Sequence, residues 1–325
     1  MRDSMRIIAF ANQKGGVGKT TTAVNLAASL AERRQKILLI DLDPQANATS
    51  ALGLEKKAGG SLYMPLLGEA DLRSKIVSTE VPNLELIPSE MDLAGAEVDI
   101  ARSDRYLHRL RDALAPLADA KPYRYILIDC PPSLGILTCN ALAAAHALII
   151  PVQCEYLALE GLTMIVRLVQ QLRESGANPN LEIEGIVMTM FDGRTRLAAQ
   201  VAEEVRSHFG ADVYETLIPR NIRISEAPSF GKPVGLYDPR SPGAHAYRKL
   251  ALEFLRRRKQ ANLPPPQPNA IPPTEAPTLE TAPETAVAVD ADMPSTSPEP
   301  KIDSHPEPAA NDSDGGAPAA VPTVN

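Results

Sequence analysis

The sequence predicts an α/β protein in which a doubly wound, mostly parallel sheet is covered by helices on both faces. Short, nearly continuous apolar runs alternate with longer segments of helical spacing, a pattern typical of strand–helix–strand crossover units. A glycine-rich turn follows the first apolar run, and two later runs end in aspartate. Because ligands of such sheets bind at the carboxyl ends of the strands, these features mark the expected binding edge.

Seven apolar runs are predicted to be buried strands, and five segments with helical spacing are predicted to be helices. The strands are expected at residues 6–11, 36–43, 84–89, 123–130, 147–152, 183–191 and 213–219. The helices are expected at residues 20–34, 93–119, 157–176, 196–210 and 243–260. Most strands are thus separated by a helix, as a parallel sheet requires.

The composition fits a cytoplasmic protein with an aliphatic core. Of the 325 residues, 44% are hydrophobic, 4% are aromatic and none is tryptophan. The sequence has no run of about 18 apolar residues that could span a membrane, and its first apolar stretch is too short for an export signal. Cys130, Cys139 and Cys154 lack paired spacing and are expected to be reduced core thiols. The five histidines are scattered and predict no metal site.

A change of composition divides the chain into a domain at residues 1–260 and a proline-rich acidic tail at residues 261–325. The tail holds half of the 30 prolines and ten acidic residues against one lysine, a net charge of −9. We expect it to be disordered, because it cannot bury enough apolar surface to offset the entropy lost on ordering. A linker or tether is favoured for it over a partner-binding segment. Residues 190–260 carry a net charge of +5, which indicates an anionic partner for that region.

The turn after the first strand has the composition of a phosphate cradle. The segment QKGGVGKTT at residues 13–21 ends like the usual loop, but Gln13 stands where its first glycine should be and a second lysine, Lys14, follows. Glycines let backbone N–H groups approach an anion, and a helix start at Lys19 or Thr20 adds its positive dipole end. Lys19 is then placed to reach phosphates, and the Thr20 hydroxyl to bind Mg²⁺. A plain glycine-rich turn is the disfavoured alternative.

Three aspartates follow buried apolar runs. Asp129 is predicted to be the Walker B carboxylate that holds Mg²⁺, because the two prolines after it fix a rigid turn. Asp43 lies further from its strand and is predicted to orient the attacking water. A capping or turn role is the alternative for each aspartate, and it is strongest for Asp41.

With these residues in place, the chain from Arg6 to about Arg258 resembles the ParA/Soj partition ATPases. The resemblance rests on five segments in order, KGGVGKTTT, DLDPQANATS, ILIDCPPSLG, MTMFDGRTRLAAQV and IPRNIRISEAPSFGKPV. That family belongs to the P-loop NTPases with a deviant Walker A motif. The resemblance implies ATP and Mg²⁺ as cofactors and an ATP-bound sandwich homodimer. It also implies non-specific binding to double-stranded DNA at the nucleoid, and slow hydrolysis stimulated by a ParB-type centromere-bound protein.

The resemblance also implies roles for individual residues. Lys14 takes the place of the signature lysine, which crosses the dimer interface to the partner's phosphates as an arginine finger does. The catalytic residues are then Lys14, Lys19, Asp43 and Asp129, and the metal site is formed by Thr20 and Asp129. The expected ATP contacts are Lys14, Gly15, Gly16, Val17, Gly18, Lys19, Thr20 and Thr21, with Pro219 and Arg220 beside the adenine.

The DNA contacts implied by the resemblance are Arg194 and Arg223, both to phosphates. Arg196, Lys232 and the run from Arg256 to Lys259 could extend this basic surface. For that run, a solvated helix end whose cations complement the helix dipole is an equal alternative. Ala46 stands where the family's DPQGN segment has glycine, which we expect to be a mild change.

Two alternatives share the phosphate cradle. A MinD-like ATPase would bind a membrane through its last helix. We expect the apolar stripe of residues 243–260 to pack on the body instead, and anionic lipid to repel the acidic tail, so no stable membrane association is expected. A redox enzyme with a bridging iron–sulfur cluster would need cysteines at matched positions on a dimer axis, and the three cysteines show no such pattern.

Overall fold

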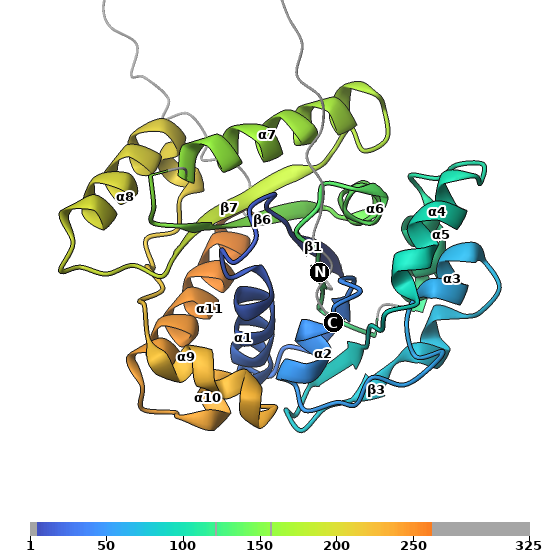
Figure 1. Ribbon diagram of the computed structural model, residues 1–325, viewed down its shortest axis with the longest axis horizontal. Helices are drawn as coiled ribbons and strands as arrows, with labels where there is room; N and C mark the ends of the chain where they lie inside the picture. Colours follow the sequence, from blue (N-terminus) through green and yellow to red (C-terminus); the bar gives the residue numbers. More distant parts are fainter. Residues whose placement is uncertain (1–4, 121, 157, 262–325) are drawn as a thin grey trace, which may run out of the picture. The chain divides into compact units, whose positions relative to one another are not determined.

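Apolar strands form a seven-stranded sheet in the computed structural model, which describes residues 5–120, 122–156 and 158–261 (Figure 1). The strands are β1 (Arg6–Phe10), β2 (Ile37–Asp41), β3 (Val77–Ser78), β4 (Leu84–Ile87), β5 (Tyr125–Asp129), β6 (Ala147–Gln153) and β7 (Glu182–Thr189). Their order is β3-β4-β2-β5-β1-β6-β7, and only the short edge strand β3 is antiparallel to its neighbour. The predicted doubly wound, mostly parallel sheet is confirmed. Of the predicted tail at residues 261–325, Ala261 is the last residue of helix α11 (Pro242–Ala261), and the rest lies outside the described residues.

The sheet order places the first strand where the winding changes direction. Strands β5, β2 and β4 lie on one side of β1, whereas β6 and β7 lie on the other. Within the ladder, Phe10 pairs with Asp129 and Asp41 also pairs with Asp129, so three strands end at the same level. The turn after β1 and the aspartates that end β2 and β5 therefore meet at the carboxyl ends of the parallel strands, as predicted.

Helices connect and cover the strands. The α-helices are α1 (Lys19–Glu32), α2 (Asn47–Ala51), α3 (Tyr63–Leu67), α4 (Leu93–Ala101), α5 (Arg109–Ala120), α6 (Ile136–Ala144), α7 (Ala158–Glu174), α8 (Arg196–Phe209), α9 (Ile222–Glu226), α10 (Val234–Tyr237) and α11 (Pro242–Ala261). The described residues also form the 3₁₀ helices η1 (Leu72–Lys75), η2 (Gly210–Asp212) and η3 (Ala227–Phe230). Within the described ranges, no helix has the length and apolar character needed to cross a membrane.

The side chains of the strands other than β3 alternate between two apolar cores. Ile8 and Phe10 of β1 pack on the face covered by α1 and α11, together with Tyr247 and Phe254. Ile7 and Ala9 point to the other face of the sheet, where the second core packs against α4 to α8. Because both faces are covered, the inner strands β2, β5, β1 and β6 are mostly apolar, which explains why continuous apolar runs predicted them.

The predicted strand at 213–219 does not form. This segment is linked to the chain at and beyond β7 by two isolated parallel bridges, at Val213 and Pro219, and by hydrogen bonds from the Tyr214 and Ile218 N–H groups to carbonyls of β7. The N–H groups of Glu215 and Thr216 instead donate to the Glu253 carboxylate of α11, at 2.7 and 2.9 Å. Pro219 has no N–H to donate. A side chain therefore satisfies the two backbone groups in the middle of the segment and interrupts the ladder.

The predicted helix at 93–119 is two helices. Between α4 and α5, the polar segment 102–108 contains Arg105 with a φ of 58°, in the left-handed region that a continuing helix excludes. The short strand β3, with both residues exposed, was not predicted because it carries no apolar run.

Two glycines far apart in the sequence touch near the end of α2. Gly53 and Gly231 both have positive φ, and a Cβ added at Gly231 would lie 2.5 Å from the Gly53 Cα. Gly176 has a φ of 76° as well, but a Cβ added there would meet nothing within 4 Å. The first pair therefore requires glycine for its conformation and for its contact, whereas Gly176 requires it only for its conformation.

We expect Gly231→Ala to lower the free energy of unfolding by about 3 kcal/mol or more, because a backbone clash adds to the left-handed strain. Gly176→Ala, the matched control, should cost only about 1–2 kcal/mol. Urea unfolding of both variants measures the difference. Equal losses would show that the Gly53 contact does not constrain position 231.

Candidate active site

The segment Asn12–Gly18 forms an open loop between β1 and α1. Gly16 and Gly18 have φ values of 73° and 84°, so both positions favour glycine, while Gln13 is not in the left-handed region. A Cβ added at Gly15 or Gly16 would meet nothing within 4 Å. The backbone here is open on one side, where an anion could approach it.

Two hydrogen bonds to the neighbouring strands β6 and β7 hold the loop in place. Val17 is buried, and its carbonyl accepts a hydrogen bond from the Thr189 hydroxyl of β7 at 2.8 Å. Asn12 is also buried, and it donates to the Pro151 carbonyl of β6 at 2.8 Å. Neighbouring strands therefore hold the loop, although only its glycines and lysines gave a signal in the sequence.

Helix α1 begins at Lys19, and its first amides lie next to the loop. The first intrahelical bond runs from the Thr22 N–H to the Gly18 carbonyl at 2.9 Å, and no side chain caps this end. The N–H groups of Lys19, Thr20 and Thr21 thus have no partner within the helix, and they add to its positive dipole end. This arrangement can bind a phosphate group.

The two lysines of the loop have different surroundings. The Lys19 side chain is largely buried, its Nζ donates to the Lys14 carbonyl at 3.1 Å, and burial lowers its pKa, with Asp129 and Asp43 acting in the opposite direction. The Lys14 Nζ instead lies 2.9 Å from a carboxylate oxygen of Glu155, beyond the end of β6. One lysine is turned inward, and the other is turned across the surface.

The Asp129 carboxylate is fully buried without a hydrogen-bond partner among the described residues. Burial raises its pKa well above the usual range, and the neighbouring Asp41 raises it further. The Thr20 hydroxyl faces this carboxylate and lowers its pKa somewhat, but the geometry falls short of a hydrogen bond. A buried carboxylate with two free oxygens beside a threonine hydroxyl fits the oxygen ligands that Mg²⁺ requires.

The other two aspartates have protein partners. Asp41 accepts hydrogen bonds from the N–H and the hydroxyl of Thr49, at 2.8 and 2.7 Å, and thereby fixes α2. Burial raises its pKa. Asp43 lies near Lys19, and one of its oxygens accepts the Gln45 N–H at 2.9 Å. The capping alternative kept open for Asp41 therefore describes its contacts.

Ala46 follows in the same turn with a φ of 55° and is completely buried. The left-handed conformation costs an alanine about 1–2 kcal/mol, and the buried methyl group returns about 0.8 kcal/mol. The two terms largely offset each other, in keeping with the mild effect expected from the sequence.

The residues predicted to border an adenine lie at the same sheet edge. Pro219 forms a parallel bridge with Phe191, just after β7, and the Arg220 N–H donates to the Phe191 carbonyl at 2.9 Å. The Arg220 side chain is exposed.

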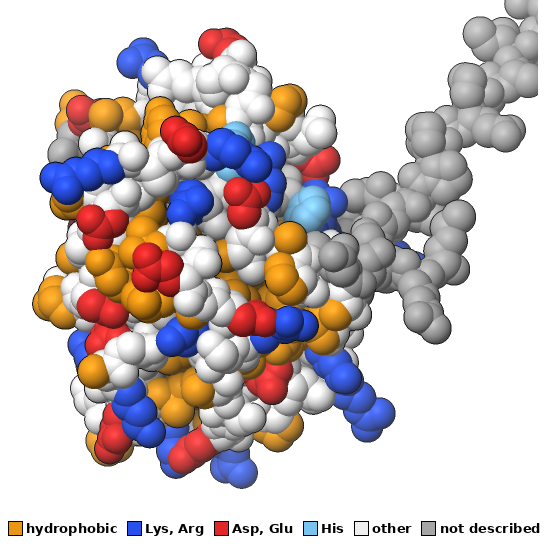
Figure 2. All heavy atoms as spheres, turned by 90° about the vertical axis from the view of Figure 1, so that its right-hand side faces the viewer, with side chains coloured by type: hydrophobic (Ala, Val, Ile, Leu, Met, Phe, Trp, Pro, Cys, Tyr) orange, Lys and Arg blue, Asp and Glu red, His pale blue; other side chains and the backbone are white. Residues whose placement is uncertain are grey.

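The two predicted DNA contacts are exposed but paired within the chain. Arg194 lies between β7 and α8, its side chain is 89% exposed, and it forms an ion pair with Asp192 at 2.7 Å. Arg223 lies on α9 and pairs with Glu226 and Asp238, at 2.8 and 3.3 Å. On the opposite face, which carries α3, α4 and α5, basic and acidic side chains are interspersed (Figure 2).

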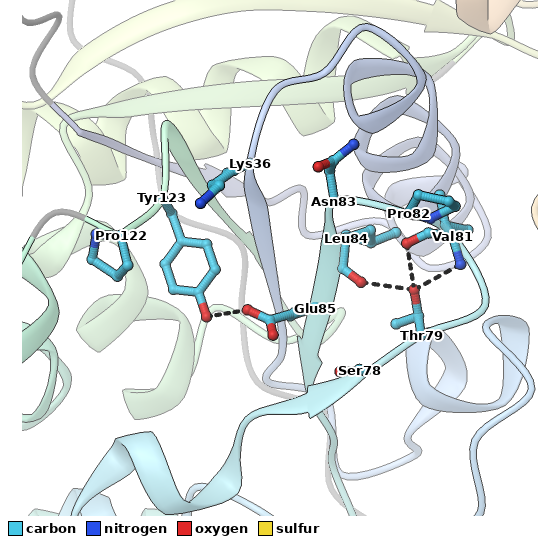
Figure 3. A pocket seen from close by; sticks show the side chains of 10 residues that line it. All are labelled: Lys36, Ser78, Thr79, Val81, Pro82, Asn83, Leu84, Glu85, Pro122 and Tyr123. Atoms are coloured by element: carbon cyan, nitrogen blue, oxygen red, sulfur yellow. Dashed lines mark hydrogen bonds between the residues drawn. The ribbon is translucent and has the colours of Figure 1, made fainter.

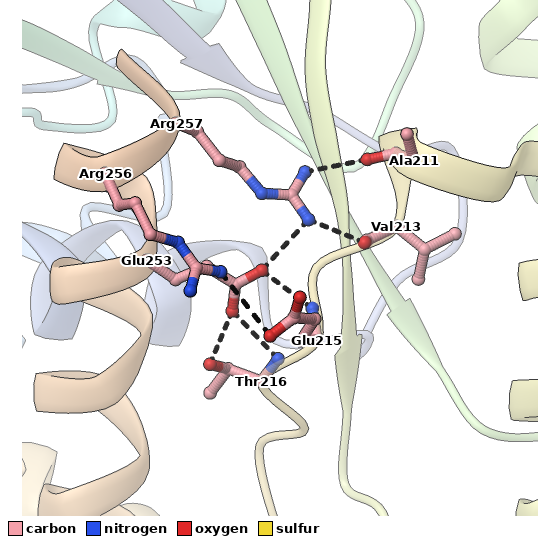
Figure 4. A network of polar contacts seen from close by, with 7 residues as sticks. All are labelled: Ala211, Val213, Glu215, Thr216, Glu253, Arg256 and Arg257. Carbon is pink, nitrogen blue, oxygen red and sulfur yellow. Dashed lines mark hydrogen bonds and ion pairs between the residues drawn. The ribbon is translucent and has the colours of Figure 1, made fainter. Parts of the chain in front are cut away.

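The basic run at the end of α11 is only partly exposed, and its extension of the DNA surface stays a prediction. Arg257 donates to Glu253 and to the Val213 carbonyl, at 2.9 and 2.7 Å (Figure 4), and Arg258 pairs with buried Glu184 at 2.9 Å. Arg256 and Lys259 are exposed, as are Arg196 and Lys232. Arg257 and Arg258 are thus paired within the chain, with Glu253 one helical turn away and with Val213 and Glu184, which are distant in sequence.

A cavity of about 410 Å³ lies at the amino ends of the strands, at the end of the sheet opposite to this site (Figure 3). Lys36, Glu85 and Tyr123 line it at the amino ends of β2, β4 and β5, and Tyr123 donates to Glu85 at 2.5 Å. None of the predicted phosphate-binding residues borders it.

The three cysteines are free thiols in the described part of the chain. Burial raises the pKa of each, that of Cys154 to about 11. A raised pKa keeps a thiol protonated and unreactive at neutral pH.

Comparisons with known proteins agree with this arrangement. A family model described as an AAA domain matches residues 5–183. The chain is 52% identical over 256 residues to the chromosome partitioning protein ParA of Caulobacter vibrioides, covering 78% of this chain and 96% of that protein. It is 53% identical to the sporulation initiation inhibitor protein Soj of Bacillus subtilis, over 76% of this chain and 97% of that protein. The structure of cobyrinic acid a,c-diamide synthase from Mycobacterium smegmatis, with a bound ATP analogue and magnesium, is 37% identical. It superposes with a TM-score of 0.69 over 79% of this chain and 97% of that chain.

The raised pKa of Asp129 gives the stability of the chain a defined pH dependence. Its folded-state pKa lies above the unfolded value, so its contribution is complete below the unfolded pKa, near 4, and is lost as the pH rises through the folded pKa. Asp129→Asn cannot ionise and should raise the free energy of unfolding at pH 7 by about 1–3 kcal/mol. Near pH 4 the variant and the original chain should unfold alike.

Chemical denaturation at the two pH values measures this effect, and Asp104→Asn, at an exposed position, is the control. If Asp129→Asn were no more stable than the original chain at pH 7, the buried charge would not be a source of strain.

Proposed function

The chain belongs to the ParA/Soj family of chromosome partitioning proteins, and we propose that it is a partitioning ATPase that acts as a dimeric switch on DNA. ATP and Mg²⁺ are its cofactors, as the bound ATP analogue and magnesium of the related synthase suggest. ATP closes a homodimer, the dimer coats double-stranded DNA non-specifically, and a ParB-type partner stimulates hydrolysis and release. The cargo is a chromosome or a plasmid.

The observation that carries this proposal is the separation of the two loop lysines. Lys19 is buried beside Asp129, where it would bind the phosphates of its own subunit. Lys14 extends to Glu155, away from that cradle. A lysine placed in this way serves a phosphate group bound by a second subunit, where it neutralises charge that develops in the transition state.

The remaining residues of the site then have defined tasks. The amides of Gly15, Gly16, Val17 and Gly18 and the first turn of α1 hold the phosphates. Thr20 and Asp129 hold Mg²⁺, which when bound neutralises charge on the transferred group. Asp43 orients the attacking water, and Pro219 and Arg220 border the base. Lys14, Lys19, Asp43 and Asp129 are the catalytic residues of this proposal.

Arg194 and Arg223 are proposed to contact DNA phosphates. Arg194 would exchange Asp192, and Arg223 would exchange Glu226 and Asp238, for DNA phosphates. The release of counterions from the DNA favours this exchange. Contacts of this kind are independent of sequence and sensitive to salt.

A MinD-like membrane function is the alternative, and helix α11 argues against it. Its apolar stripe is buried: Tyr247, Leu250, Ala251 and Phe254 are at most 1% exposed and pack in the core beside α1. The helix therefore offers no apolar face to a bilayer while it stays packed.

Lys14→Ala tests the role in the second subunit. We expect the variant to bind ATP within about twofold of the original affinity but to lose at least about a hundredfold in partner-stimulated turnover, since transition-state contacts of this kind contribute 10³–10⁵. The measurement is the rate of ATP hydrolysis with DNA, with the partner and with both. Lys57→Ala, at an exposed lysine, is the control. Normal stimulation of Lys14→Ala would refute this role.

Arg194→Ala and Arg223→Ala should weaken DNA retention without preventing ATP-dependent dimerisation. Each lost phosphate contact should reduce the slope of log affinity against log salt by about 0.9. Arg105→Ala is the control, because Arg105 is also exposed and paired, with Asp112 at 3.2 Å, between α4 and α5. Filter retention over a salt series measures the slope, and loss of dimerisation in either variant would contradict a separate DNA surface.

A further inference from the structure

The backbone of Lys14 is held on both sides. Its N–H donates to the Asn12 side chain at 3.1 Å, and its carbonyl accepts the Lys19 ammonium at 3.1 Å. Asn12 is itself buried and tied to β6 through the Pro151 carbonyl. The backbone of Lys14 is therefore fixed, and only its side chain can move from one binding partner to another.

That side chain is engaged by its own subunit. The Lys14 Nζ lies 2.9 Å from Glu155 Oε2, and the other oxygen of Glu155 accepts the Gln153 amide at 2.5 Å. The carboxylate is thus oriented by one neighbour and neutralised by the other. The two side chains of the pair are 36% and 44% exposed, so the pair stands at the surface.

The next residue shows that this surface is uncovered. Tyr156 is 84% exposed, the largest exposure among the large hydrophobic side chains in the described part of the chain. A large aromatic side chain gains by burial against another surface. The Lys14–Glu155 pair therefore lies beside a position that a second subunit would cover.

We propose that Glu155 is a positioning residue that retains Lys14 in its own subunit until a second subunit offers it a phosphate group. This inference rests on the proposed function of Lys14. Closing the dimer then requires the Lys14–Glu155 pair to open in both subunits. The pair raises the nucleotide and protein concentrations needed for closure, and it keeps the free chain from presenting its lysine.

The expected size follows from the exposure of the pair. Half-exposed ion pairs shift an equilibrium by about twofold to fivefold. Two such pairs open for each dimer, so their loss should lower the dimer dissociation constant by about fourfold to twenty-five-fold. The gain should disappear near 1 M salt, where the screening length is about 3 Å.

Glu155→Gln tests the proposal, because it removes the charge and leaves an amide oxygen for Gln153. Glu160→Gln makes the same charge change at an exposed position in the first turn of α7 and is the matched control. Dimerisation is measured by sedimentation with Mg²⁺ and a non-hydrolysable ATP analogue, at low salt and near 1 M salt. In parallel, acylation of Lys14 in the nucleotide-free chain is followed by mass spectrometry.

We expect Glu155→Gln, but not Glu160→Gln, to dimerise more tightly at low salt and to expose Lys14 to acylation about twofold to fivefold faster. Unchanged acylation, or dimers that are unchanged or weaker while the original chain dimerises normally, would overturn the role of Glu155 and leave the proposed function standing. If the original chain bound the analogue but never dimerised, both proposals would fail.

Discussion

The uncompensated burial of the Asp129 carboxylate is the constraint on which the ligand edge depends. Water is excluded from it, no described hydrogen bond replaces that water, and Asp41 adds a second carboxylate in the adjacent register position. Lys19, which is buried as well, offsets only part of this charge. Under the proposed function, a bound Mg²⁺ would supply the compensating charge that this carboxylate lacks.

The apolar packing of the rest of the fold offsets the free-energy cost of burying the Asp129 carboxylate. Strands β2, β5 and β1 are buried on both faces, and α1, which starts at the loop, packs along α11 in an apolar core. Because β6 and β7 anchor the loop through Asn12, Val17 and Thr189, the glycines can stay open to an anion without loosening the chain around them. Rigid support and an exposed backbone thus occur within a few residues of each other.

Patterns that are local in sequence predicted the fold and the phosphate loop. Continuous apolar runs located six of the seven strands, and the strand ends located Asp41, Asp43 and Asp129. Features that join distant residues were not predictable in this way. The Glu253 carboxylate on α11 accepts hydrogen bonds from the N–H groups of Glu215 and Thr216. Arg258 forms an ion pair with Glu184 on β7, and Lys14 forms one with Glu155, 141 residues away. Each of these contacts forms only when the folded sheet brings the two residues together, so no spacing of residues in the sequence predicts it.

The contact between Gly53 and Gly231 has a mechanical consequence. Gly53 follows α2, which Asp41 anchors through Thr49, and Gly231 ends the 3₁₀ turn η3, which packs on α9 and therefore on the segment of Arg223. With no side chain between the two backbones, there is no compressible layer to absorb a displacement. The segment after Asp41 and the helix that carries Arg223 are thus joined by a direct contact between two backbones, with no side chain between them.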